Sequence, residues 1–233
     1  MKLKGRIALI TGASSGIGMS IAEKFSAEGS TVAIASRDFS RIKDVAGKIK
    51  NSYPYKLDVS DRKEVETVIS EVISRFKRID ILVNNAGIAE WGSVIDSPYE
   101  HFERQINVNL LGTIYCTKAV IKFMAEQRSG TIINISSGLG KRGEAEASAY
   151  CASKFGVIGF SESIAEELKQ YRINVHIISP GMVDTPIHDS YIAKDSSERK
   201  KMLMPEEIAD VALFLATKPY YVGIKEISVR PNY

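Results

Sequence analysis

Strand-length apolar runs alternate with helical patterns along the chain, and this alternation restricts the possible folds more than any other feature. The runs are rich in β-branched residues and nearly continuous in apolar character, which is typical of strands buried on both faces of a parallel sheet. Strands that alternate with helices predict βαβ units, and hence an α/β fold with a doubly wound parallel sheet of about seven strands flanked by helices on both faces. The expected strands cover residues 6–11, 31–36, 53–58, 80–85, 130–136, 173–179 and 224–229.

Helical periodicity is clearest in three segments, residues 17–28, 65–76 and 205–217. The last of them opens with Pro205 and two acids, which suit the first turn of a helix. Because the chain has 233 residues and no linker or repeat, we expect one domain over residues 1–233. Residues 182–204 show no clear pattern, and their late position makes them a candidate substrate lid.

The charge balance and the apolar pattern argue against several classes of protein. The net charge is +3 and evenly spread, so no nucleic-acid partner is expected. No apolar run approaches the roughly 20 residues of a membrane-spanning helix, so no membrane partner is expected. Cys116 and Cys151 are far apart, and a reducing cytoplasm is the expected compartment. His101, His176 and His188 lack metal-ligand spacing, so we interpret them as structural or incidental and expect no metal.

Two further features each allow two interpretations. The densest basic run is Arg199–Lys201, which we expect to form a solvated face, with contact to an acidic ligand as the alternative. Trp91 and Tyr99 follow the fourth expected strand and either line a substrate pocket or cover the edge of the sheet. Only the position of these residues in the fold can decide between the interpretations.

A glycine-rich loop, ITGASSGIG, follows the first expected strand and opens the first expected helix. Gly12 suits the tight turn, while Gly16 and Gly18 allow a phosphate and the sheet to approach the backbone closely. Free N–H groups at the helix start and the hydroxyls of Ser14 and Ser15 can then bind the anion. This position within the first βαβ unit indicates a dinucleotide site. No Gly-Lys-Ser/Thr sequence follows, so the loop is not a P-loop.

The end of the second expected strand bears on which dinucleotide binds. NAD-binding folds of this kind usually carry an acid there, to hold the ribose 2′-hydroxyl. Here Ser36 takes that place and Arg37 follows, and a guanidinium can pair with a 2′-phosphate. NADP(H) is therefore favoured over NAD(H), provided that Asp38 caps the next helix and does not pair with Arg37.

Tyr150 and Lys154 are four residues apart, so on a helix they lie on the same face. Alone, such a pair is most often surface packing. Beside a cofactor, the ammonium would stabilise the phenolate and lower the tyrosine pKa from its usual value near 10. A tyrosine tuned in this way could exchange a proton with a carbonyl oxygen. Cys151, next to Tyr150, is interpreted as packing.

Taken together, the motifs resemble those of the short-chain dehydrogenase/reductase family over nearly the whole chain. They occur in the order typical of that family and at matching spacings. The serine at the family's usual distance before the tyrosine is Ser137, not Ser136. The matching motifs are TGASSGIG at 11–18, LDV at 57–59, NNAG at 84–87, NVNLLG at 107–112, ISS at 135–137, YCASK at 150–154 and PGMVDT at 180–185.

The resemblance implies a Rossmann-like fold and an NADP(H)-dependent oxidoreductase that interconverts a carbonyl and an alcohol. Tyr150 would act as general acid/base, Lys154 would lower its pKa and bind the nicotinamide ribose, Ser137 would polarise the substrate oxygen, and Asn109 would hold a water in a proton relay. The implied cofactor contacts are Gly12, Ser14, Ser15, Gly16, Ile17, Gly18, Ser36, Arg37, Asp58, Val59, Asn85, Ala86, Gly87, Tyr150, Lys154, Pro180, Gly181, Val183 and Thr185.

The sequence departs from the family pattern in two places. Many NADP-preferring members carry a basic residue before the middle glycine, where this chain has Ser15, so the NADP(H) preference depends on Arg37. The chain also ends without the glycine-rich tail common in the family. The substrate stays open between small ketones and aldehydes, hydroxy acids, sugars and 3-oxoacyl thioesters. A non-catalytic dinucleotide sensor is the alternative function, and the family resemblance implies a homodimer or homotetramer.

Overall fold

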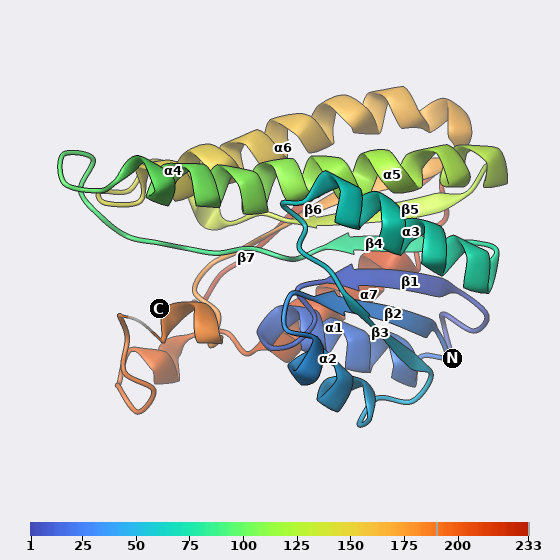
Figure 1. The fold of residues 1–233 in the computed structure, drawn as a ribbon, viewed down its shortest axis with the longest axis horizontal. Coiled ribbons are helices and arrows are strands. Elements are labelled where there is room, and N and C mark those ends of the chain that lie inside the picture. The colour runs from blue at the N-terminus through green and yellow to red at the C-terminus, as the bar shows by residue number, and fades with distance from the viewer. Residues whose placement is uncertain (190, 233) are drawn as a thin grey trace.

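A seven-stranded parallel sheet runs through the middle of the computed structural model, which describes residues 1–189 and 191–232 (Figure 1). The strand order is β3-β2-β1-β4-β5-β6-β7, and each neighbouring pair is parallel. All expected strands are confirmed, with ends within two residues of the predicted bounds. The strands are β1 (Ile7–Thr11), β2 (Thr31–Ser36), β3 (Ser52–Lys56), β4 (Ile81–Asn84), β5 (Gly130–Ile135), β6 (Ile173–Pro180) and β7 (Glu226–Val229).

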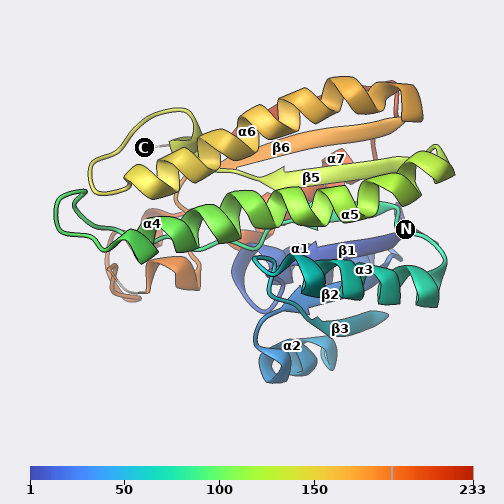
Figure 2. The same ribbon diagram turned by 45° about the horizontal axis from the view of Figure 1, so that its top comes forward.

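Helices cover both faces of the sheet, as the sequence predicts (Figures 1 and 2). In β1, Ala8 and Ile10 face the core beneath α1, α2 and α7, whereas Leu9 faces the core beneath α3, α5 and α6. The strand is therefore apolar from Ile7 to Ile10 because both of its faces are buried. No helix in the described part of the chain is both long and apolar enough to cross a bilayer. The helices are α1 (Gly16–Ala27), α2 (Phe39–Ala46), α3 (Arg62–Phe76), α4 (Tyr99–Gln105), α5 (Gly112–Gln127), α6 (Ser148–Leu168) and α7 (Pro205–Ala216).

The strand order reverses between β1 and β4, and this reversal creates the site. The chain leaves β1 toward β2 and β3 on one side, and the later strands build outward from β4 on the other. A crevice therefore opens at the carboxyl ends of β1 and β4. Thr11 joins the two ends, because its hydroxyl oxygen accepts the N–H groups of Asn85 and Ala86, each at 3.1 Å.

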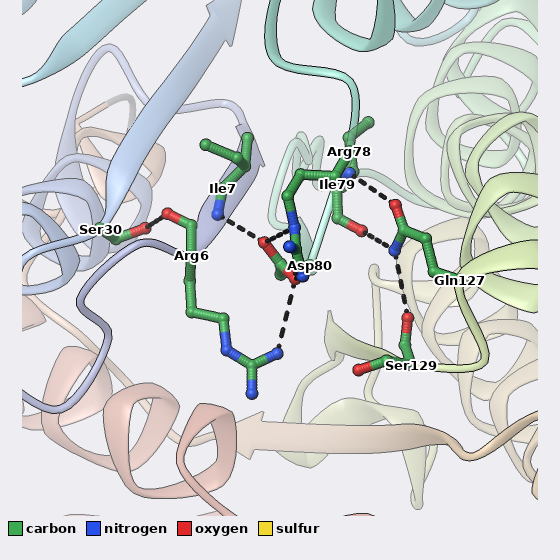
Figure 3. A network of polar contacts seen from close by, with 8 residues as sticks. All are labelled: Arg6, Ile7, Ser30, Arg78, Ile79, Asp80, Gln127 and Ser129. Carbon is green, nitrogen blue, oxygen red and sulfur yellow. Dashed lines mark hydrogen bonds and ion pairs between the residues drawn. The ribbon is translucent and has the colours of Figure 1, made fainter.

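At the amino-terminal ends of the strands, opposite the crevice, a buried carboxylate joins the starts of β1 and β4 (Figure 3). Asp80 is fully buried and accepts a 2.8 Å hydrogen bond from the backbone N–H of Ile7. Arg78 bonds to both oxygens of the same carboxylate, and Arg6 lies 3.5 Å from it. Two partly exposed guanidinium groups thus compensate a charge that burial alone would make costly.

Gln127, at the end of α5, hydrogen bonds through its side-chain amide to backbone groups at the same ends of the strands (Figure 3). Its oxygen accepts from the N–H of Ile79 at 3.2 Å, and its nitrogen donates to the carbonyls of Ile79 at 2.9 Å and Ser129 at 3.2 Å. One side chain therefore satisfies backbone groups in both segments that enter the central strands β4 and β5.

We expect the substitution Asp80→Ala to lower the free energy of unfolding by about 2 kcal/mol, because it leaves the Ile7 N–H buried without an acceptor. The half-exposed arginines limit the further loss, since water can solvate them. Urea-induced unfolding measures the effect. The matched control is Glu66→Ala, which removes an exposed partner of Arg62 at 3.7 Å and should change the free energy by less than about 0.5 kcal/mol. Equal effects of the two substitutions would contradict the role given to Asp80.

Candidate active site

A cavity of about 1130 Å³ opens at the carboxyl ends of the strands. Its walls come from the segments that follow β1 to β6 and from the first turns of α6. All but two of the site residues predicted from the sequence line this cavity, and the exceptions are Gly18 and Asn109. The predicted residues in the wall are Gly12, Ser14, Ser15, Gly16, Ile17, Ser36, Arg37, Asp58, Val59, Asn85, Ala86, Gly87, Ser137, Tyr150, Lys154, Pro180, Gly181, Val183 and Thr185.

The glycine-rich loop forms a cradle that side chains would fill. Gly12 and Gly16 both have left-handed backbone angles, with φ of +65° and +53°. A Cβ on Gly12 would lie 2.7 Å from the Cα of Ala86, so the loop can pass β4 only without a side chain there. The loop leads directly into α1, whose free N–H groups can hold a phosphate. The geometry therefore fits a dinucleotide pyrophosphate.

Gly18 permits a close approach between the first helix and the sheet, as expected. It is buried in α1 and does not line the cavity. A Cβ at this position would lie 2.4 Å from the amide nitrogen of Asn85, which itself donates to the carbonyls of Thr11 and Gly12. Gly18 therefore allows the helix to approach the end of β4, and its predicted contact with the cofactor stays a prediction.

The residues after β2 place a cation at the cavity wall. The hydroxyl of Ser36 donates to that of Ser14 at 3.0 Å. The side chain of Arg37 is exposed on the cavity wall. Asp38 caps α2 by accepting from the N–H of Arg41 at 3.0 Å, as predicted. In the part of the chain that the structure describes, Asp38 and Arg37 form no ion pair. A 2′-phosphate could therefore pair with Arg37.

Asp58 lies on the same side of the cavity, after β3. One of its oxygens accepts the N–H and the hydroxyl of Ser60, at 2.9 and 2.6 Å. These bonds fix the direction of the carboxylate, so its other oxygen can accept a hydrogen bond from an amino group such as that of adenine.

The predicted triad of Ser137, Tyr150 and Lys154 meets at the inner end of the cavity. Ser137 follows β5 and hydrogen bonds to Tyr150, and its oxygen also accepts from the N–H of Leu139 at 3.1 Å. The Lys154 ammonium lies 5.7 Å from the centre of the Tyr150 ring and donates to the carbonyl of Ile135 at 2.9 Å. Helix α6 thus presents Tyr150 and Lys154 on one face, against the end of β5.

Burial controls the protonation of both α6 side chains. It raises the pKa of Tyr150 to about 12, and the hydrogen bond with Ser137 opposes this rise. It lowers the pKa of Lys154 to about 8. Burial is the largest influence on the Tyr150 pKa in this structure, and the predicted lowering of that pKa by Lys154 stays a prediction. Tyr150 is therefore a neutral hydrogen-bond donor at pH 7.

Asn109 lies behind the cavity wall, in a π-helical segment at Ile106–Leu111 that joins α4 to α5. Its side-chain oxygen accepts from the N–H of Ile88 at 2.8 Å, and its nitrogen donates to the Ile88 carbonyl at 2.9 Å and to Ser153 Oγ at 3.0 Å. Ser153 in turn donates to the carbonyl of Tyr150 at 2.7 Å. Asn109 therefore ties the loop after β4 to the helix that carries Tyr150, and its proton-relay role stays a prediction.

Aromatic side chains form the substrate end of the cavity. Trp91 lines it, with its ring centre 6.3 Å from that of Tyr150 and 5.5 Å from that of Tyr191. Tyr99 is 84% exposed at the start of α4 and does not line the cavity, so only one of the two aromatic candidates belongs to the pocket. His188 also lines the cavity and contacts the Tyr191 hydroxyl, and its interpretation as a structural or incidental residue stays a prediction.

The other histidines and the cysteines lie outside this cavity lining. His176 is buried in β6 and contacts the carbonyl of Ile224, while His101 lies 3.3 Å from Glu90. Cys116 and Cys151 are both buried free thiols. Packing therefore accounts for Cys151, as predicted.

Arg199 departs from the predicted solvated basic face, whereas Lys200 and Lys201 are exposed as predicted. It is only 5% exposed, and its guanidinium bonds to the carboxylates of Asp184 and Asp189. These acids satisfy its charge, so Arg199 does not serve an acidic substrate. Its two carboxylate partners are upstream in the sequence, and nothing in the local pattern shows that the chain folds back to bring them to Arg199.

The C-terminal tail adds cavity residues that sequence reasoning missed. Arg230 and Pro231 line the cavity beside Gly181, whose N–H donates to the carbonyl of Val229 at 2.7 Å. Their place depends on the pairing of β7 with β6, which no local motif reveals. Residues 182–204, predicted as a lid, contribute Ile187 and Ile192 to the cavity wall.

Comparison with known proteins identifies the family. Residues 6–196 match the family described as short chain dehydrogenase. The 3-oxoacyl-acyl-carrier-protein reductase of Thermotoga maritima is 37% identical, and galactitol 2-dehydrogenase of Agrobacterium fabrum is 38% identical; each alignment covers 93% of this chain and 92% of the relative. A metagenomic short-chain oxidoreductase solved in complex with NADP matches with a TM-score of 0.87 and 32% identity over 100% of both chains. The chain therefore belongs to the short-chain dehydrogenase/reductase family and is an oxidoreductase.

Proposed function

We propose that this protein is an NADP(H)-dependent oxidoreductase that interconverts a carbonyl and an alcohol. The observation that carries this proposal is the meeting of Ser137, Tyr150 and Lys154 at the inner end of a cavity that begins with a dinucleotide cradle. The nicotinamide cofactor, when bound, supplies or accepts the hydride, while the protein provides binding, orientation and proton transfer.

The protonation state of Tyr150 suits carbonyl reduction. Because its pKa is raised to about 12, the phenol keeps its proton at pH 7 and can give it to an oxygen that develops negative charge. Leu139 donates to the Ser137 oxygen, so the Ser137 proton can point at the same substrate oxygen. Two donors would then stabilise the developing alkoxide, in the manner of an oxyanion hole.

Lys154 is buried and donates one of its N–H groups to the Ile135 carbonyl. The remaining N–H groups are positioned for the hydroxyls of the nicotinamide ribose, because Gly87 beside it leaves the cavity wall without a side chain. Asn109 has its side chain fully bonded within the protein, so a relay water would bind at its backbone carbonyl, to which Thr113 Oγ1 already donates at 2.8 Å.

Two observations bear on the substrate and on the alternative function. The relatives of nearly equal identity include a 3-oxoacyl thioester reductase and a polyol dehydrogenase by name, and a 3-oxoacyl thioester is the alternative substrate class that we carry forward. The retention of all three side chains of the triad, in contact across α6 and β5, favours turnover over a dinucleotide sensor.

We further propose that two copies pair through α5 and α6, and that the protein works in the cytoplasm. These helices lie side by side on one face of the sheet (Figures 1 and 2). Phe155 is 46% exposed on α6, and Gly159, one turn later, is also exposed. Both cysteines are free thiols, which supports a reducing compartment.

The proposed reaction is tested with purified protein, NADPH and a panel of diketones, aldehydes and 3-oxo esters, followed by the loss of NADPH absorbance. We expect Tyr150→Phe to lower kcat/KM for any substrate turned over by at least about 100-fold, because the proton donor is removed. NADPH affinity, measured by fluorescence, should stay within about twofold of wild type. Tight NADPH binding without turnover of any substrate would favour the sensor instead.

Arg37→Ala tests the choice of cofactor. We expect the KM for NADPH to rise about tenfold or more, with little change for NADH, since only NADPH carries a phosphate for the guanidinium. Steady-state kinetics with each cofactor measure the difference. Lys48→Ala removes an exposed cation from the same half of the fold and should affect neither KM. An equal effect of Arg37→Ala on both cofactors would remove the NADP(H) assignment.

Gly159→Glu tests the proposed pairing. A Cβ at this position meets no atom within 4 Å in the described chain, and glutamate favours helix by up to about 1 kcal/mol over glycine. The subunit should therefore fold normally while the carboxylate blocks a partner helix, and light scattering should show a monomer. Lys48→Glu, in the α2 layer, should leave the mass unchanged. A wild-type protein that is already monomeric at micromolar concentration would contradict the pairing.

A further inference from the structure

The segment between β6 and α7 is closed at its base by backbone hydrogen bonds. Val183 and Leu203 form a parallel bridge, with Asp184 N–H donating to the Leu203 carbonyl at 2.8 Å and Leu203 N–H donating to the Met182 carbonyl at 3.0 Å. Residues 184–189 and 191–202 therefore belong to a loop whose ends are adjacent, and we call these residues the lid loop. It is the orange segment at the lower left of Figure 1. Such loops are packed by their own side chains.

A cation, Arg199, occupies the interior of the lid loop. Its guanidinium bonds to the carboxylates of Asp184 and Asp189 and to the carbonyls of Thr185 at 3.2 Å and Ile192 at 3.5 Å. One side chain thus joins the beginning, the middle and the end of the loop. Because an arginine stays charged at any ordinary pH, it can be buried here only while these acceptors surround it.

One of these acceptors links the lid loop to the phosphate cradle. Thr185 directs its methyl group at Gly16, where a Cβ would lie only 2.9 Å from Thr185 Cγ2. Thr185 Oγ1 also contacts the Val183 carbonyl at 3.3 Å, which fixes its rotamer on the cavity wall. A displacement of the Thr185 backbone would therefore change the wall against which the cofactor lies.

We propose that Arg199 is a positioning residue for the cofactor, which holds the Thr185 backbone and the lid loop against the phosphate cradle. This inference rests on the proposed nicotinamide cofactor. Arg199 does not reach the cofactor itself, since it does not line the cavity. It acts through Thr185. The loss of its guanidinium hydrogen bonds would release residues at both ends of the lid loop at once.

The test is a double-mutant cycle on NADPH affinity, measured by fluorescence titration of Arg199→Gln, Thr185→Ala and the double variant. We expect Arg199→Gln to weaken NADPH binding about tenfold, because a small displacement of a positioning contact has a large effect. The double variant should bind no more than about twofold more weakly than the weaker single variant, since residues that act through one another are not additive. Arg199→Lys, which keeps the charge but not the planar guanidinium with its several N–H donors, should recover part of the affinity.

The matched control is Lys194→Gln, which removes the same charge from the same loop. Lys194 is 78% exposed and pairs with Asp189 at 3.2 Å, so NADPH affinity should stay unchanged. If Arg199→Gln proves too unstable to titrate, Asp189→Asn removes one of the two carboxylates and should weaken binding in the same direction.

Three results would overturn the inference. One is a lower melting temperature for Arg199→Gln with NADPH affinity within about twofold of wild type, which indicates a structural role alone. A second is additive losses in the double variant, which indicate that Arg199 and Thr185 act independently. Wild-type protein that binds neither NADPH nor NADH would overturn the proposed function as well, whereas the first two results leave it intact.

Discussion

The close contact between the ends of β1 and β4 is the constraint on which the rest of the structure depends. Thr11 accepts the N–H groups of the residues after β4, and Gly12 passes Ala86 at a distance that no side chain allows. This contact forces the chain to leave the two strands in opposite directions. The crevice that results receives the glycine-rich loop from one side and the triad from the other.

Buried polar groups define the site, and each is held by several partners. Lys154 is bonded to a strand carbonyl, Asn109 uses its whole amide within the protein, and Arg199 is surrounded by two carboxylates. Each group would be costly to bury without these acceptors and donors, so each can occupy one arrangement only. The same principle applies at the amino-terminal ends of β1 and β4, where Asp80 is bonded by two arginines and a backbone N–H.

Most of the fold and the cofactor wall could be predicted from local patterns, whereas several individual roles could not. Strands such as β1 and β6 are mostly apolar because both faces are buried, and that signal is visible in a single sequence. Gly18 belongs to the expected motif, yet its role depends on Asn85, which is distant in sequence. Arg199 reads as part of a solvated basic run, because its two acids lie upstream and reach it only after the loop closes.

The sequence by itself determined the order of strands and helices and the phosphate cradle, because these follow from periodicity and from a short motif at a set spacing. Ser137, Tyr150 and Lys154 were predicted as site residues from the resemblance to the family, and the last two also share a helix face by their spacing. The tertiary structure decided the protonation of Tyr150, the packing role of Gly18, the entry of Trp91 and His188 into the cavity and the burial of Arg199. The physical reason is common to all of these: solvation and charge depend on neighbours that come from distant parts of the chain, and a local pattern carries no record of which neighbours will arrive.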